Sequence, residues 1–188
     1  LIYKFPFVRK IFDAQLKLTS NYINRHLKSL SLLYPNNNKV IGLIEKYQFD
    51  QTVNFGSVQN FTYNKKQYST HYLQMAYRIE QLSNYFDFNK INSLLEIGGG
   101  FGSNIHFLLS NFKNIKKVVY LDIVPNIFVG TQYLKSIFKD NVKDYLYFRD
   151  KNQIKFENND KLEIYCLPSW EIQKLTCKVD HFHNASSF

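Results

Sequence analysis

Apolar residues recur at a spacing of three to four residues in three stretches of the first half of the chain. These stretches cover about 11–34, 40–47 and 66–86, and the spacing predicts an amphipathic helix in each. Pro35 and the asparagines after it end the first helix. Residues 48–57 have no clear period, so we expect a loop there.

After residue 86 the pattern changes to short apolar runs that alternate with helical stretches. Strands are predicted at 93–97, 117–122, about 162–166 and 178–184, and helices at about 103–111 and from Pro125 to about 138. Short runs without alternation indicate strands buried on both faces, as in a parallel α/β sheet. Residues 140–160 are rich in Asp, Asn and Lys and receive no assignment.

The predicted fold is α/β, with a Rossmann-like doubly wound parallel sheet preceded by an α-helical amino-terminal segment. We place the helical segment, or lid, at 1–66 and the sheet domain at 67–188. Since 86 residues follow Gly102, fewer than a doubly wound domain normally carries beyond its switch point, we expect the first half of such a domain, truncated after about its fourth strand.

Composition narrows the class of protein. Hydrophobic residues make up 45% of the chain and aromatic residues 17%, which argues against disorder. No apolar run approaches the length of about 20 residues that spans a bilayer, and the first residues lack a secretory signal, so we expect a cytoplasmic protein. Cys166 and Cys177 are too few for a disulfide framework or a zinc site.

The formal net charge of +9 raises the question of a nucleic-acid partner. The 24 Lys and Arg residues are scattered, and the densest groups are pairs such as Lys65-Lys66 and Lys116-Lys117. A nucleic-acid site needs basic residues gathered on one face, so nucleic acid is not the expected partner.

Candidate chemistry begins at Glu96-x-Gly98-x-Gly100-x-Gly102, with Gly99 inside the motif, between the first predicted strand and its helix. Glycines allow the backbone angles of such a turn and let a ligand approach the main chain and the helix amino terminus. Glu96 can hold the turn amides or an amino-acid part of a cofactor. Asp122 ends the next strand, 20 residues after Gly102, where it can accept both hydroxyls of a ribose.

Spacing separates this motif from two other glycine-rich turns. A dinucleotide motif starting at Gly98 would need Gly or Ala where Ser103 stands, and one starting at Gly100 would need Gly where Ile105 stands. A phosphate-binding P-loop is excluded because no Gly-Lys-Ser/Thr follows. The alternative to a ligand-binding motif is that these glycines form a tight turn that binds no ligand.

The stretch from about 93 to 188 resembles the sugar O-methyltransferase family of bacteria, whose members are class I S-adenosylmethionine-dependent methyltransferases. The resemblance is carried by residues 95–102, 119–126, 130–134, Leu167-Pro168-Ser169-Trp170 and Asn184-Ala185-Ser186-Ser187-Phe188. The glycine motif is shared by most class I methyltransferases, whereas the last two stretches are more particular to this family.

The resemblance implies methyl transfer from S-adenosylmethionine to a hydroxyl of a sugar or glycan. It implies that the glycines cradle the methionine part of the cofactor and that Asp122 holds its ribose. Ile123, Leu167 and Trp170 are the expected adenine pocket, and Asn184 is the candidate for the site of methyl transfer.

No catalytic base is assigned, and no metal site is predicted. His181 and His183 share one face of a strand but lack a third metal ligand. Packing in the core explains four other aromatic residues equally well: His71, His106, Tyr68 and Tyr72. One alternative is a methyltransferase that acts on another small molecule or on RNA, and basic residues around the pocket would favour RNA. Another alternative is an inactive protein that keeps the cofactor fold. The sequence does not reveal the oligomeric state.

Overall fold

The computed structural model describes residues 38–48 and 60–184 and divides the chain into two compact units, Leu1–Gly42 and Leu43–Phe188. The helix predicted at 11–34 and most of the loop predicted at 48–57 lie outside the described residues. Helix α2 (Asn38–Lys46) forms where the sequence predicts a helix at 40–47.

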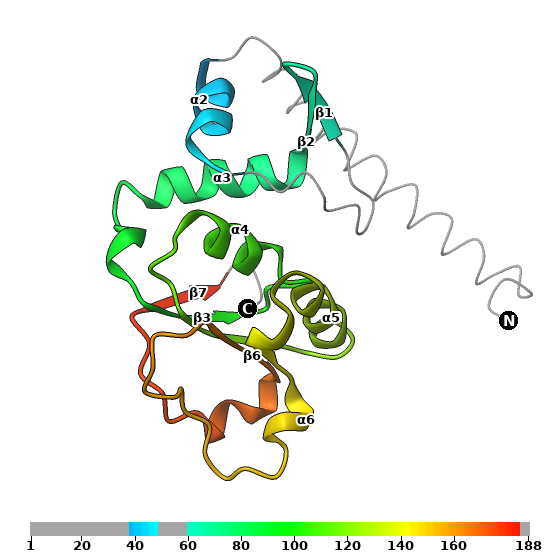
Figure 1. Cartoon of the computed structure of the whole chain (residues 1–188), viewed down its shortest axis with the longest axis vertical. Coiled ribbons are helices and arrows are strands. Elements are labelled where there is room, and N and C mark those ends of the chain that lie inside the picture. The colour runs from blue at the N-terminus through cyan, green and yellow to red at the C-terminus, as the bar shows by residue number, and fades with distance from the viewer. Residues whose placement is uncertain (1–37, 49–59, 185–188) are drawn as a thin grey trace, which may run out of the picture. The chain divides into compact units, whose positions relative to one another are not determined.

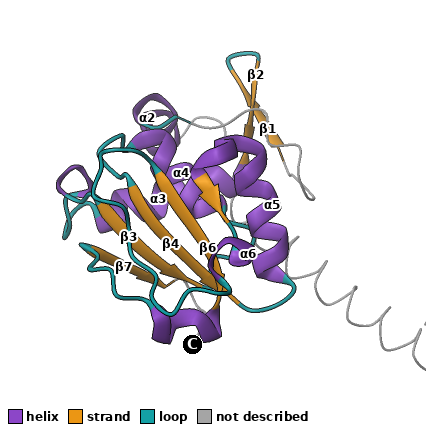
Figure 2. Cartoon of the chain, turned by 60° about the horizontal axis from the view of Figure 1, so that its bottom comes forward, coloured by secondary structure: helices purple, strands orange, loops and turns teal. Residues whose placement is uncertain are grey.

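The second unit is built on a five-stranded parallel sheet with the order β5-β6-β4-β3-β7. Figure 2 shows β6, β4, β3 and β7 side by side. The strands are β3 (Ser93–Ile97), β4 (Lys117–Asp122), β5 (Val142–Lys143), β6 (Glu163–Pro168) and β7 (His181–Asn184). The α/β class with a parallel sheet is confirmed, and the topology is compatible with a Rossmann-like fold. The prediction of four strands was wrong by one, because β5 has only two residues and too short an apolar run to detect.

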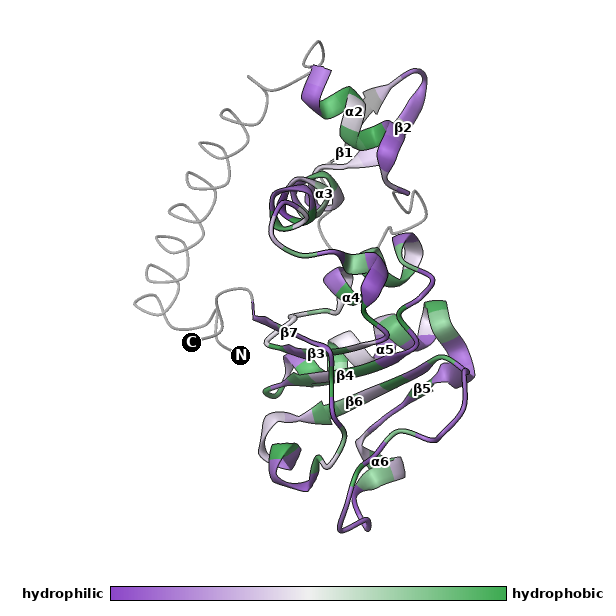
Figure 3. Ribbon diagram, turned by 90° about the vertical axis from the view of Figure 1, so that its left-hand side faces the viewer, coloured by the Kyte–Doolittle hydropathy of each residue, from purple (hydrophilic) through white to green (hydrophobic). Residues whose placement is uncertain are grey.

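Helices cover both faces of this sheet. Figure 1 shows α3 and α4 on one side, and Figure 3 shows α6 on the other. The helices of this unit are α3 (Thr70–Leu82), α4 (Ser103–Asn111), α5 (Asn126–Phe138) and α6 (Tyr145–Phe148), with 3-10 turns η2 (Phe88–Lys90), η3 (Lys139–Asn141) and η4 (Ser169–Lys174). Among the described residues, no helix has both the length and the apolar character needed to cross a membrane.

The helix predicted at 66–86 is shorter at both ends, because α3 begins at Thr70 and ends at Leu82. Its first four residues form β2 (Lys66–Ser69), which pairs antiparallel with β1 (Asn60–Tyr63). Asn64 and Lys65 connect the two strands with positive φ angles of 48° and 63°, the backbone of a two-residue hairpin turn. The sequence there is Asn-Lys, without the glycine that usually signals such a turn, so the hairpin was missed.

Three other boundaries differ from the prediction. Strand β6 continues through Leu167 and Pro168, which were expected in its exit loop. Strand β7 begins at His181, three residues later than predicted. Pro125 occupies the position before the first helical residue of α5. In the unassigned stretch, Tyr145–Phe148 forms α6, and Asp144 caps it by accepting a hydrogen bond from the amide of Tyr147.

The two faces of the sheet follow from alternation along its strands. Val119, Leu121 and Leu167 form a buried cluster with Phe148 of α6 and with Ile154. On the other face, Glu96 lies against Asn104 of α4, and Tyr120 lies against Gly130 of α5. Neighbouring residues of one strand therefore serve a packed core and a polar site.

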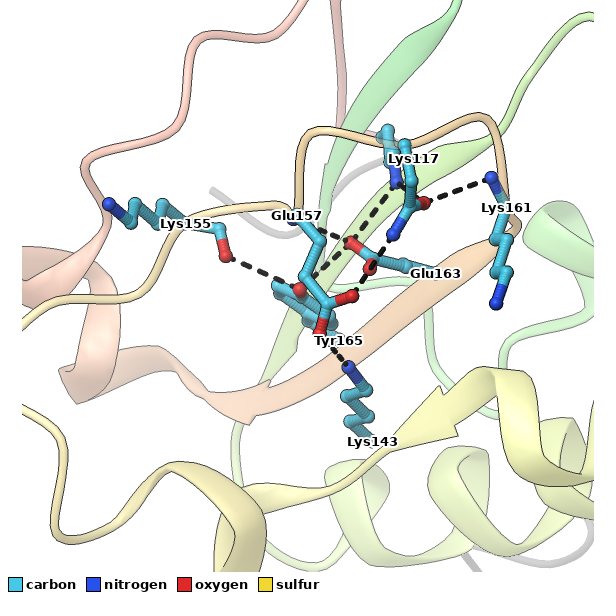
Figure 4. A network of polar contacts seen from close by, with 8 residues as sticks. Lys117, Lys143, Lys155, Glu157, Lys161, Glu163 and Tyr165 are labelled. Atoms are coloured by element: carbon cyan, nitrogen blue, oxygen red, sulfur yellow. Dashed lines mark hydrogen bonds and ion pairs between the residues drawn. The ribbon is translucent and has the colours of Figure 1, made fainter.

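A polar network closes the amino end of the sheet, away from the strand ends that carry the candidate site (Figure 4). Glu163 is buried, and its Oε2 atom lies 3.3 Å from Nζ of Lys117 and accepts hydrogen bonds from the hydroxyl of Tyr165 and the amide of Glu157. Lys143 binds Glu157 at 3.2 Å. Since these groups neutralise one another, the network is structural.

Candidate functional site

The glycine turn follows β3 at the carboxyl end of the sheet. Gly98, Gly100 and Gly102 have φ angles of 72°, 62° and 84°, a conformation that L-residues with side chains rarely adopt. A side chain at Gly100 would meet no described atom within 4 Å. The Cα atom of Gly100 therefore faces open space on this side, although its amide and carbonyl groups are bound by Asp122 and Tyr120.

Gly99 is needed for a different reason, its contact with Glu96. A Cβ atom at Gly99 would lie 2.8 Å from the carboxyl carbon of Glu96 and 2.9 Å from its Oε2 atom. The turn thus closes directly over this carboxyl group, which the sequence predicted only as lying at the strand end.

Glu96 is 1% exposed. Its Oε1 atom accepts a hydrogen bond of 3.0 Å from the side-chain amide of Asn104, whereas Oε2 has no hydrogen-bond partner among the described residues. Burial raises the pKa of Glu96 to about 7, with a smaller contribution from the charge of Asp122. A buried carboxyl oxygen without a donor is costly, so this atom is suited to a donor group of a ligand.

Asp122 ends β4 and is tied to the glycine turn. Its Oδ2 atom accepts a hydrogen bond of 2.9 Å from the amide of Gly100, and Oδ1 accepts one of 2.7 Å from the amide of Ile123. The side chain is buried, with 5% exposed. The structure therefore brings together the two carboxylates and the glycines that the sequence singled out.

Tyr120 was missed by the sequence analysis. Its hydroxyl donates to the carbonyl oxygen of Gly100 and lies 3.2 Å from Oδ2 of Asp122. Burial is the main cause that raises its pKa, so the phenol stays protonated. A signal was present, because residues two apart on a strand share a face, and Tyr120 precedes Asp122 by two.

Gly130 of α5 was also missed as a site residue, although it lies in a stretch that supported the family resemblance. A Cβ atom there would lie 2.6 Å from the Tyr120 hydroxyl oxygen and 2.9 Å from the carbonyl oxygen of Gly100. The absence of a side chain lets α5 lie close to the turn.

Asn184 ends β7 beside the glycine turn. Residue 184 pairs with Ile97, the last residue of β3, and the Asn184 side-chain amide donates a hydrogen bond of 3.3 Å to the carbonyl oxygen of Ile97. The carboxyl ends of β3, β4, β6 and β7 thus meet at one edge, the usual ligand-binding edge of an open parallel sheet.

The three residues expected to hold adenine are placed differently from one another. Trp170 is 59% exposed and lines a groove of about 290 Å³, whereas Ile123 is 60% exposed and is not among the residues that line this groove. Leu167 is fully buried in the opposite core, so only its main chain remains for a ligand. The groove is lined by Val124, Ile127, Phe128, Thr131, Gln132, Asp144, Tyr145, Leu146, Cys166, Pro168 and Trp170.

The amino-terminal turn of α3 packs on the glycine turn. The rings of His71 and Phe101 stack with centroids 5.4 Å apart, and Nε2 of His71 lies 2.9 Å from Oγ of Ser103. Deeper in the same contact, the hydroxyl groups of Tyr72 and Tyr133 and Nδ1 of His106 lie 2.5–2.6 Å from one another. Helix α3 is therefore joined to both helices that flank the turn.

His181 and His183 share one face of β7, with ring centroids 6.1 Å apart. Burial lowers the pKa of His183 to about 4 and also lowers that of His181. Nε2 of each is buried without a hydrogen-bond partner among the described residues, and residue 183 pairs with Glu96 in the sheet. Both imidazoles are neutral at pH 7, and within the described residues no three potential ligands gather around a metal position.

Comparisons with protein-family models, with curated proteins and with solved structures find no match. The geometry therefore carries the functional argument. Among the described residues, the site offers a glycine turn with open space at the Cα atom of Gly100, a buried carboxyl oxygen of Glu96 without a hydrogen-bond donor, and a second carboxylate on the next strand. A largely apolar groove begins at Val124 and Pro168, near the end of that strand.

Proposed function

We propose that this protein is an S-adenosylmethionine-dependent methyltransferase. The observation that carries the proposal is the joint position of Glu96, the open turn at Gly100 and Asp122 at the carboxyl ends of two adjacent parallel strands. A nucleoside linked to an amino acid would find carboxylates suited to its ribose hydroxyls and to its ammonium group at this edge.

The residues present fit this cofactor. Glu96 would accept from the ammonium group with its unpartnered Oε2 atom. Gly98, Gly99, Gly100 and Gly102 would allow the amino-acid part to approach the main chain. Asp122 would hold the ribose mainly through Oδ1, which is bound to the Ile123 amide and can accept a second hydrogen bond, because Oδ2 is bound to the Gly100 amide and is also approached by the Tyr120 hydroxyl. Ile123 and Trp170 would pack against the adenine.

When bound, the cofactor would supply an electrophilic methyl group to an acceptor hydroxyl. The contribution of the chain is to hold the two reactants close and in line. Asn184, at the end of β7, would orient the acceptor through its side-chain amide. No residue is assigned as the base that takes the hydroxyl proton.

A sugar or glycan hydroxyl is the proposed acceptor, on the strength of the sequence resemblance, and a role in bacterial glycan synthesis follows from it. The groove beside the site favours a small molecule over RNA, because no Lys or Arg is among the described residues that line it. An RNA-binding surface would be rich in basic side chains.

Calorimetric titration of S-adenosylhomocysteine, the product of methyl donation, tests the proposal. We expect saturable binding that Asp122→Ala weakens by about 1–3 kcal/mol through lost hydrogen bonds to a charged acceptor. Asp150→Ala is the matched control, because the Asp150 side chain is 87% exposed and lies outside the strand ends. A folded protein that shows no binding would contradict the proposal.

A further inference from the structure

The first turn of α3 brings an imidazole to the glycine turn. His71 stacks on Phe101, a residue of the turn, and its Nε2 atom lies 2.9 Å from the hydroxyl oxygen of Ser103. Ser103 is the first residue of α4. An imidazole from one helix and a hydroxyl from another thus meet at the amino end of α4.

This helix end lacks a side-chain cap. Gly102 occupies the N-cap position of α4 and has no side chain that could accept hydrogen bonds from the first-turn amides. Such amides carry a partial positive charge and favour an anion. His71 and Ser103 add two groups that can donate hydrogen bonds to the same anion.

A second and independent feature points to a ligand here. Oε2 of Glu96 is buried and has no hydrogen-bond partner among the residues described, and Oε1 of the same carboxyl group is bound by Asn104 in the first turn of α4. Donors that favour an anion and an acceptor that favours a cation therefore lie within one helical turn of each other.

We propose that His71 and Ser103 bind the carboxylate of a zwitterionic α-amino acid group whose ammonium group is bound by Glu96. The inference rests on the proposed function, because S-adenosylmethionine carries such a group. His71 is then a positioning residue that fixes the amino-acid end of the cofactor and selects ligands with a free carboxylate.

Two ligands separate this role from a structural one. S-adenosylhomocysteine carries the amino-acid group, and 5′-methylthioadenosine lacks it. By calorimetry, we expect His71→Phe, which keeps the ring but has no donor, and Ser103→Ala each to weaken binding of S-adenosylhomocysteine about tenfold, as expected when a hydrogen bond to a charged group is lost. Binding of 5′-methylthioadenosine should stay within about twofold of the unsubstituted protein.

His181→Phe is the matched control, because His181 lies on β7 against Phe86 and Phe88, and this substitution should leave both affinities unchanged. The inference is overturned if His71→Phe and Ser103→Ala leave binding of S-adenosylhomocysteine intact, or if they weaken both ligands equally. If the unsubstituted protein binds neither ligand, the proposed function itself is wrong and the inference falls with it.

Discussion

The amide of Gly100 donates a hydrogen bond of 2.9 Å to Oδ2 of Asp122, which joins the glycine turn after β3 to the last residue of β4. The turn is therefore shaped by the carboxylate that we propose for ribose binding. Tyr120 strengthens this connection from the same strand, because its hydroxyl binds the Gly100 carbonyl oxygen and approaches Asp122. A ligand at this site would meet a turn that is already fixed.

Gly130→Ala is expected to disturb this connection from the side of α5. The added methyl group would lie 2.6 Å from the Tyr120 hydroxyl oxygen and 2.9 Å from the Gly100 carbonyl oxygen. Because main chain yields less than a side chain, we expect a loss of about 1–3 kcal/mol in the free energy of unfolding. Urea denaturation measures it, and binding of S-adenosylhomocysteine should weaken as well.

Gly42→Ala is the control for Gly130→Ala. Gly42 lies inside α2, and a Cβ atom there would meet no described atom within 4 Å. Alanine favours a helix interior over glycine by about 0.5–1 kcal/mol, so this variant should be at least as stable as the original protein. Equal stability of the two variants would contradict the proposed close packing at Gly130.

Lys117→Met is expected to destabilise the amino end of the sheet by about 3 kcal/mol, because it leaves Glu163 buried without its cation. The side chains of Lys117 and Glu163 are 13% and 5% exposed, and their charged atoms lie 3.3 Å apart. The double variant Lys117→Met/Glu163→Gln should recover part of the loss, since no net charge then remains buried. Chemical denaturation of the two variants gives the comparison.

Arg149→Ala is the control for this buried pair. The side chains of Arg149 and Asp150 are 58% and 87% exposed, and exposed pairs contribute less than about 1 kcal/mol. If Lys117→Met costs no more than Arg149→Ala, the network in Figure 4 does not stabilise the fold as we infer.

Tyr72→Phe and Tyr133→Phe test whether α3 is held to the glycine-turn helices by one cooperative unit. Each substitution should lower the free energy of unfolding by about 1 kcal/mol through a lost buried hydrogen bond. The two hydroxyl groups lie 2.5 Å apart and both approach Nδ1 of His106. In a double-mutant cycle, the loss in the double variant should therefore differ from the sum of the two single losses by at least about 0.5 kcal/mol. Additive losses would show that the hydroxyl groups act independently.

Most strands of the sheet could be predicted because burial on both faces leaves a continuous apolar run. Strands β3 and β4 lie at the predicted residues for this reason. The hairpin strand β2 was read as the start of a helix, because four residues are too few to separate a period of two from one of 3.6. Strand β5 was missed because it is defined by its pairing with β6. Its own two residues are too few to show a strand pattern.

Within the candidate site, the sequence identified the glycines, Glu96 and Asp122 because each has a reason to stand at a strand end. It did not predict that Glu96 and His183 would be paired neighbours, since strand order is set by the path of the chain over the sheet. The placement of Leu167 in the opposite core depends on the face that each residue of β6 occupies. The prediction ended this strand at about residue 166 and so left Leu167 outside it, where alternation assigns a residue to neither face.

The buried carboxyl group of Glu96 should make stability depend on pH in an unusual direction. Burial raises its pKa from an ordinary value of 4.5 to about 7, so between these pH values the folded state keeps a proton that the unfolded chain has released. The contribution of Glu96 to the free energy of unfolding therefore falls as pH rises from about 4.5 to 7 and stays low above that range. The loss is about 3 kcal/mol.

Glu96→Gln isolates this contribution, because glutamine keeps an acceptor for Asn104 and is uncharged at every pH. Relative to the unsubstituted protein, the variant should have similar stability at pH 4.5 and gain up to about 3 kcal/mol by pH 8, measured by urea denaturation. Glu157→Gln should show no such gain, since Lys143 holds the pKa of Glu157 below its ordinary value. A constant difference between Glu96→Gln and the unsubstituted protein from pH 4.5 to 8 would mean that Glu96 is ionised throughout, and that a donor already occupies Oε2.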